Sequence, residues 1–112
     1  MRTEDFVSAI EAYVLNTTVE STVSTLREPP GRRVDPEFAA RSTWFNLLSD
    51  TDAEMVRAVI HEAASSAVFG FLTVLDGARV INDEKGTFEL YYVGREKNLL
   101  NPPDIALHEL LQ

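Results

Sequence analysis

The chain has 112 residues, no cysteine and a formal net charge of −8, from 18 acidic and 10 basic side chains. This length suits one domain, which we expect to span residues 1–112 and to bury one hydrophobic core. The lack of cysteine excludes a disulfide scaffold, a thiol nucleophile and any cysteine-ligated metal site. The acidic excess argues against binding to nucleic acid or to an anionic membrane, because like charges repel.

The N-terminal segment predicts a helix that ends before a proline-rich loop. Thr3 is a suitable N-cap, and the two acidic residues after it favour the positive end of the helix dipole. Apolar residues recur with helical spacing on one face, at Phe6, Ile10, Tyr13 and Val14. Residues 17–25 are rich in poor helix formers, but their valines keep helical spacing, so we expect the helix to continue.

Two further helices are predicted in the middle of the chain. Pro29-Pro30-Gly31 ends the first helix, and Asp35-Pro36-Glu37 has the residues of a new helix start. Thr51–Glu54 matches a capping box and opens the longest expected helix, which ends at Asp76-Gly77. Its second half is apolar on nearly every side, so we expect that half to be central and buried.

The C-terminal third predicts a hairpin and a short helix. Ala78–Asn82 and Thr87–Val93 are β-like runs joined by a loop of hairpin length, and a last helix should follow Pro102-Pro103. An isolated hairpin is only marginally stable, so we expect it to pack on the long helix. The predicted fold is therefore mainly α with a small antiparallel β-hairpin (α+β): four to five helices around a long central helix, then the hairpin and the short last helix.

The chain lacks the common motifs for phosphate, metal and cofactor binding. Its five glycines form neither a dinucleotide-binding nor a P-loop pattern, and there is no GxSxG elbow. His61-Glu62 begins like a zinc-protease helix, but Ser65 occupies the position of the second histidine. We therefore expect no metal and no cofactor.

An unfamiliar enzyme site remains as a third, lower-ranked hypothesis. It would use one of the two histidines, His61 or His108, as an acid–base group beside a carboxylate. The candidate carboxylates are Glu62, Asp76 and Glu109. This hypothesis requires a histidine–carboxylate pair that lines a cleft.

The sequence favours a cytoplasmic protein that does not enter membranes. Two acidic residues, Glu4 and Asp5, stand where the apolar run of a signal peptide would begin. The most apolar stretch, Ala67–Leu75, is much shorter than the roughly 20 residues that cross a bilayer. A homodimer is compatible with the spare aromatic residues, although no heptad seam demands one.

Acidic and aromatic side chains are the candidate contacts to a protein partner. Adjacent aromatics cannot face the same way, so one residue of Trp44/Phe45 and one of Tyr91/Tyr92 should reach the surface. Exposed tryptophan and tyrosine are favoured interface anchors. The candidate partner-binding residues are Asp50, Asp52, Glu54, Asp83, Glu84, Trp44 and Tyr91.

Three arginines support an alternative function. Arg32, Arg33 and Arg79 would bind a small anion if their guanidinium groups converged on one pocket, as in a regulatory domain. The same arginines could instead dock their loops onto acidic helices of this chain.

Several short motifs follow one another in a fixed order between residues 26 and 111. They are Pro29–Arg33, Trp44–Leu48, Phe69–Arg79, Gly86–Val93, Leu99–Pro102 and Leu107–Leu111. In this order they resemble a group of small uncharacterised bacterial proteins, which supplies no catalytic residue. Proteins of this size and charge are in turn similar to immunity proteins encoded beside contact-dependent or polymorphic toxins. The resemblance implies a non-enzymatic protein that binds and neutralises a basic partner protein, such as a toxin domain.

Overall fold

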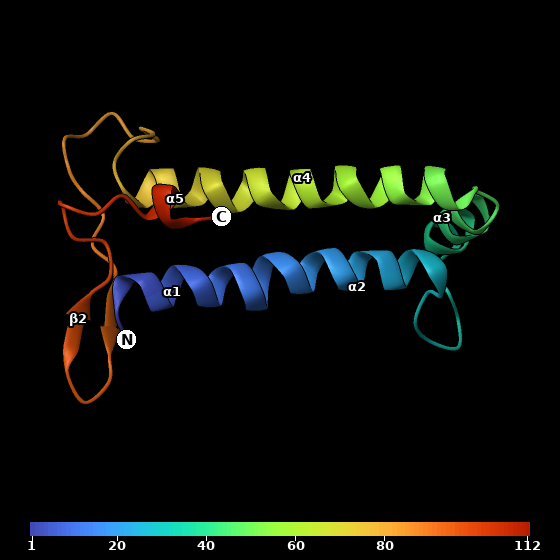
Figure 1. Ribbon diagram of the computed structural model, residues 1–112, viewed down its shortest axis with the longest axis horizontal. Coiled ribbons are helices and arrows are strands. Elements are labelled where there is room, and N and C mark those ends of the chain that lie inside the picture. The colour runs from blue at the N-terminus through green and yellow to red at the C-terminus, as the bar shows by residue number, and fades with distance from the viewer.

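Two long antiparallel helices form the body of the protein in the computed structural model, which describes all 112 residues (Figure 1). The first runs unbroken through α1 (Thr3–Ile10), the π-helical η1 (Glu11–Leu15) and α2 (Asn16–Arg27). α3 (Pro36–Asn46) then turns the chain, and α4 (Asp50–Leu75) returns beside the first helix. The predicted fold class is confirmed, since 59% of the chain is helical and the rest includes a small antiparallel hairpin.

The π-helical turn decides which side chains of the first helix face α4. The backbone N–H of Asn16 donates to the carbonyl of Glu11, five residues earlier, so this turn holds one residue more than an α-helical turn. The prediction that Tyr13 and Val14 share the inner face is therefore wrong, because they are 78% and 46% exposed. The buried positions lie on either side of the extra residue, at Thr3, Val7, Leu15, Val19 and Val23.

The helix starts agree with the sequence at one place and differ at two. Asp35 caps α3 as predicted, with its Oδ1 accepting the Glu37 N–H at 2.9 Å. α4 begins before the predicted capping box, because the hydroxyl of Ser49 accepts the Asp52 N–H at 3.1 Å. Thr3 does not cap α1: it is the first helical residue and is buried.

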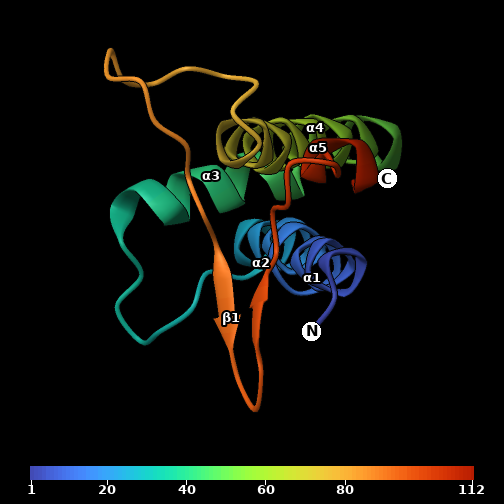
Figure 2. The ribbon, with the colours of Figure 1, turned by 90° about the vertical axis from the view of Figure 1, so that its left-hand side faces the viewer.

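The hairpin forms from other residues than predicted and in another place. β1 (Tyr91–Val93) pairs with β2 (Lys97–Leu99), so the hairpin turn lies between Val93 and Lys97. Residues 78–82 form no strand, because the segment that was to pair with them meets the chain around Leu100 instead. The hairpin extends past the start of α1 and away from α4, which corrects the expected packing on the long helix (Figure 2).

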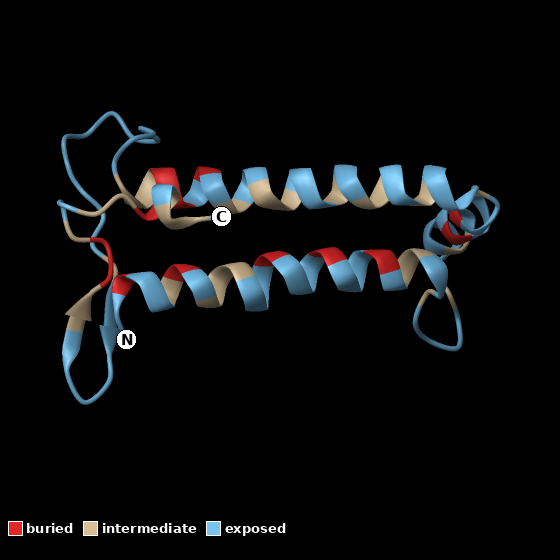
Figure 3. Ribbon diagram, viewed as in Figure 1, coloured by how far each residue is buried: buried red, intermediate tan, exposed pale blue.

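The hydrophobic core lies at one end of the helix pair. Val7 of α1, Leu72 of α4 and Leu107 of the short α5 (Leu107–Leu110) are each at most 1% exposed. Half-buried apolar side chains surround them, namely Phe6, Val68, Leu75, Leu110 and Leu111. The rest of α4 is much more open, since its only buried residues fall in its last six positions (Figure 3).

The second half of α4 is therefore not buried as a whole, contrary to the prediction. Phe69 and Phe71 are 44% and 64% exposed. The helix also has the length and composition of one able to cross a membrane: an 18-residue window has a mean hydropathy of 1.6, and 17% of that window is buried. The expectation based on Ala67–Leu75 alone understated this apolar stretch, and the cytoplasmic location stays a prediction.

Candidate functional site

The corner between α3 and α4 brings together four of the seven predicted partner-binding residues. Trp44 is 53% exposed while its neighbour Phe45 is 2% exposed, which confirms that one of this pair reaches the surface. Phe45 points inward beneath the guanidinium of Arg27, whose central carbon lies 5.3 Å from the ring centroid.

Hydrogen bonds to the end of α2 hold α3 in this orientation. The hydroxyl of Ser42 and the side-chain amide of Asn46 both donate to the carbonyl of Arg27, at 3.2 and 3.0 Å. This carbonyl belongs to the last turn of α2, where helical partners are missing. Because α3 is fixed through Ser42, Phe45 and Asn46, Trp44 is left on the outside.

The acidic residues of this corner are free of internal ion pairs. Asp50, Asp52 and Glu54 are all exposed, and none forms a salt bridge within 4 Å, although the charge of Glu54 contributes to the raised pKa of Arg57. The cap of α4 is supplied by Ser49, so the three carboxylates are not used for capping. They make no capping hydrogen bond, although Asp50 and Asp52 in the first turn favour the helix dipole.

Leu47 joins these residues and was missed by the sequence analysis. It follows the last residue of α3 and is 82% exposed, the joint highest value among the large apolar residues. The available signal was a leucine close to the predicted start of the next helix and three residues from the tryptophan. We call this surface the Trp44 corner and define it by Trp44, Leu47, Asp50, Asp52 and Glu54.

The other three predicted partner-binding residues lie at the opposite end of the helix pair. Asp83 and Glu84 belong to the long loop after α4, and Tyr91 belongs to β1 (Figure 1). The hydroxyl of Tyr91 donates to the Glu89 carboxylate at 3.1 Å, and this hydrogen bond raises the pKa of Tyr91. The Lys97 ammonium also lies 4.3 Å from the centre of its ring. The seven residues therefore form two separate groups, and Tyr91 is already engaged within the hairpin.

The three arginines of the alternative site do not converge. Arg32 and Arg33 lie in the loop between α2 and α3, whereas Arg79 follows α4 at the other end (Figure 1). The guanidinium of Arg79 lies over Gly70, with Nη1 2.8 Å from the position that a Cβ on this glycine would occupy. The predicted anion pocket of three arginines is therefore not formed.

A histidine–carboxylate pair does occur, at the end of α4. His108 Nδ1 lies 2.6 Å from Asp76 Oδ2, and the Asp76 side chain is only 6% exposed. Both residues line a cleft of about 550 Å³ between the end of α4 and the chain before α5. Of the two histidines, only His108 has a carboxylate partner, since the Nδ1 of exposed His61 is 3.5 Å from the Ser65 hydroxyl.

The bonds of Asp76 indicate a structural role for this pair. Its carboxylate also accepts the backbone N–H groups of Leu107 and His108, at 2.9 and 3.0 Å, so it caps α5. The ring of His108 packs edge-on against Phe69, with centroids 5.3 Å apart. The pair fastens the C-terminal segment to α4.

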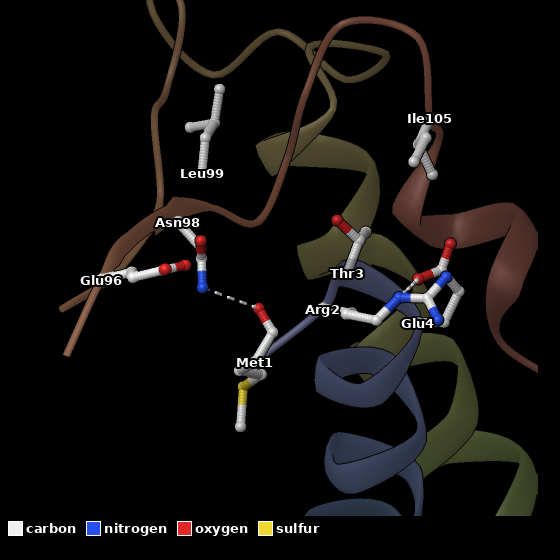
Figure 4. A pocket seen from close by; sticks show the side chains of 8 residues that line it. All are labelled: Met1, Arg2, Thr3, Glu4, Glu96, Asn98, Leu99 and Ile105. Carbon is white, nitrogen blue, oxygen red and sulfur yellow. Dashed lines mark hydrogen bonds and ion pairs between the residues drawn. The ribbon is translucent and has the colours of Figure 1, made fainter. Parts of the chain in front are cut away.

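A second cleft, of about 530 Å³, lies between the start of α1, β2 and the chain before α5 (Figure 4). Asn98 donates to the carbonyl of Met1 at 3.3 Å, and Arg2 pairs with Glu4 at 3.6 Å. These contacts tie the N-terminus to the hairpin and bring no acid–base pair together. Nowhere in the chain do three or more histidine, aspartate or glutamate side chains lie close enough together to hold a metal ion.

No protein-family model, curated protein or solved structure matches the chain at significant similarity. Among the arrangements described above, the Trp44 corner combines an outward tryptophan, an exposed leucine and unpaired carboxylates. Aromatic anchors rimmed by polar groups are characteristic of protein-binding surfaces.

Proposed function

We propose that this protein is a non-enzymatic binding protein of the cytoplasm, which captures a basic partner protein and neutralises it as an immunity protein does its toxin. The observation that carries the proposal is the Trp44 corner, where an outward tryptophan precedes exposed carboxylates that form no salt bridge in the chain. The net charge of −8 means that the whole molecule, and not the corner alone, attracts a basic partner.

The two kinds of residue in the corner would contribute differently to binding. Trp44 and Leu47 expose apolar surface that a partner would remove from water, and tryptophan is among the commonest hot-spot residues. The carboxylates of Asp50, Asp52 and Glu54 would mainly steer a basic partner and raise the association rate. A partner site that binds nucleic acid is positively charged, so an acidic protein seated on it excludes the phosphate backbone.

The proposal is tested by affinity capture of the tagged full chain from its native cell lysate, at low and high salt, read by mass spectrometry. We expect one basic protein to be enriched at low salt and depleted at high salt, because salt screens exposed charges. The captured protein is then purified, and its dissociation constant is measured by titration calorimetry. Trp44→Ala should weaken binding by about 30-fold or more, the loss typical of a hot spot.

The two acidic groups at opposite ends provide a matched comparison. The triple variant D50N/D52N/E54Q should slow association, whereas D83N/E84Q removes acids from the far loop and should leave binding at the corner unchanged. Capture of no basic protein, or equal binding by wild type, Trp44→Ala and the triple variant, would contradict the proposal. Circular dichroism of each variant confirms that α4 is intact, since acids in its first turn also favour the helix dipole.

A further inference from the structure

The isolated chain exposes far more surface than a folded monomer of its size. A 12.5 kDa monomer is expected to expose about 6,200 Å², but this chain exposes 8468 Å². Its radius of gyration is 18.2 Å, whereas a domain of this length has about 13 Å. The excess of about 2,300 Å² is within the area that each subunit of an obligate dimer buries, roughly 1,000–2,500 Å².

Several of the exposed large apolar side chains lie on α4. Met55, Val59 and Phe71 are 64%, 67% and 64% exposed, and Ala63 and Ala67 between them are exposed as well. The five residues are spaced by four and form a ridge that winds by about 40° per step around the helix. Val59, Ala63 and Ala67 share one face, and Met55 and Phe71 lie about 80° to either side of Ala63. From Ala63 to Leu75 α4 contains no charged residue. A helix that is apolar on nearly all sides is normally covered.

We propose that a second copy of this chain covers the ridge, with the two α4 helices antiparallel about a two-fold axis that passes near Ala63. In this register Val59 lies beside Ala67 of the second copy, and Met55 and Phe71 lie at the edges of the contact. The small side chains at the centre let the helices approach closely, and the large ones fill the space at either end. Interdigitated ridges of residues spaced by four are the commonest helix packing, with the axes crossing at about −50°.

The charges around the ridge fit this arrangement in spite of the net charge of each copy. Arg79 has no ion-pair partner within the chain, and its guanidinium lies over Gly70. Gly70 is seven residues from Ala63 and so lies on the same face of α4. In the antiparallel register Gly70 lies opposite Val56 of the second copy, next to the acidic first turns of that helix. Each Arg79 guanidinium therefore lies towards the acidic N-terminal end of the other α4 helix.

The mass in solution and cysteine cross-linking test this arrangement. Light scattering coupled to size exclusion should give twice the 12.5 kDa of one chain. Because the chain has no cysteine, any disulfide formed by a single-cysteine variant joins two copies. Ala63→Cys should oxidise to a covalent dimer. Ala58→Cys, on another exposed alanine of α4 about 140° around the helix, should cross-link at least about tenfold more slowly.

A charged residue introduced on the ridge provides a second test of the dimer. Ala67→Glu should weaken dimerisation by about 100-fold or more, since it buries an unpaired carboxylate. Ala58→Glu adds the same charge off the ridge and should leave the mass unchanged. If Ala67→Glu fails to fold by circular dichroism, the two cysteine variants decide, because alanine to cysteine is a small change.

Three results would overturn the proposal. One is a dimer that cross-links through position 58 and not through position 63. The other two both require that the chain stays a monomer of 12.5 kDa at every protein concentration up to about 100 µM, which is far above the dissociation constant of an obligate interface. Co-sedimentation of that monomer with phosphatidylcholine vesicles would then assign the ridge to a bilayer, and its absence would assign it to a different protein.

Discussion

The last turns of α4 and the rest of the helix differ sharply in burial, although they belong to one unbroken helix. Its last six residues hold Gly70, Leu72 and Thr73, all buried, while no residue from Asp50 to Phe69 is buried. The difference comes from the C-terminal segment, which folds back over the end of α4 and supplies Leu107 to the core. The remainder of the helix has only the first helix on one side of it (Figure 3).

The contrast teaches that polar side chains, and not the core alone, close this end. The side-chain amide of Asn101 donates to the carbonyls of Leu75 and Phe88, both at 2.9 Å, and its oxygen accepts the Leu90 N–H at 2.8 Å. The carboxylate of Asp76 holds α5 in the same manner. Two buried side chains thereby connect segments that carry almost no regular secondary structure.

The largest effect is expected from truncating the core of the closed end. Leu107→Ala should lower the free energy of unfolding by about 3 kcal/mol, because Leu107 is fully buried and such truncations leave a cavity. Urea denaturation at fixed protein concentration measures the change. Leu47→Ala is the matched control, since this leucine is 82% exposed. Similar losses for both leucines would show that the closed end has no special core.

A somewhat smaller loss of stability is expected from removing the side-chain amide of Asn101. Asn101→Ala should destabilise the chain by about 2 kcal/mol, because it leaves three partly buried backbone groups without this partner. Hydrogen exchange should show the loss first at the Leu90 amide. Asn98→Ala removes a single bond at the exposed edge of the hairpin and serves as control. Equal protection of Leu90 in both variants would refute the role given to Asn101.

The smallest effect is expected in the open half, from the ion pair between Glu20 of α2 and Arg57 of α4. Their hydrogen bond lowers the pKa of Glu20 and raises that of Arg57. A lowered folded-state pKa means that Glu20 stabilises the chain above its unfolded pKa, and that this contribution disappears as the pH falls through the folded value. Glu20→Gln should therefore be slightly less stable than wild type at neutral pH, and equally stable in acid.

The control for this variant is Glu28→Gln, which removes an exposed carboxylate that has no ion pair. Thermal unfolding at several pH values and salt concentrations measures both variants. High salt should also abolish the difference for Glu20→Gln, because the pair is exposed to solvent. A difference that persists in acid would contradict the ion-pair explanation.

The sequence by itself determined the helical character of the chain and some of the helix boundaries. Asp35-Pro36-Glu37 and Asp76-Gly77 act over a few residues, so their effects are local: Asp35 caps α3, and Gly77 adopts a φ of 78° at the end of α4. The burial of one residue of the Trp44/Phe45 pair could be predicted, but not which of the two is buried. Adjacent positions on a helix face different ways, but the packing of α3 on α2 decides which one is buried.

Only the tertiary structure decided where the hairpin forms, which face of the first helix is buried and which candidate residues meet. Residues 78–82 have strand-like composition but no partner, because Asn101 and Leu100 engage the segment that was to pair with them. The π-helical turn exchanges Val14 for Leu15 on the inner face, and it carries no mark in the sequence. The antiparallel course of the two long helices separates Arg32 from Arg79 and Asp50 from Asp83 (Figure 1). Such outcomes depend on contacts between residues far apart in the chain, and local propensity carries no information about them.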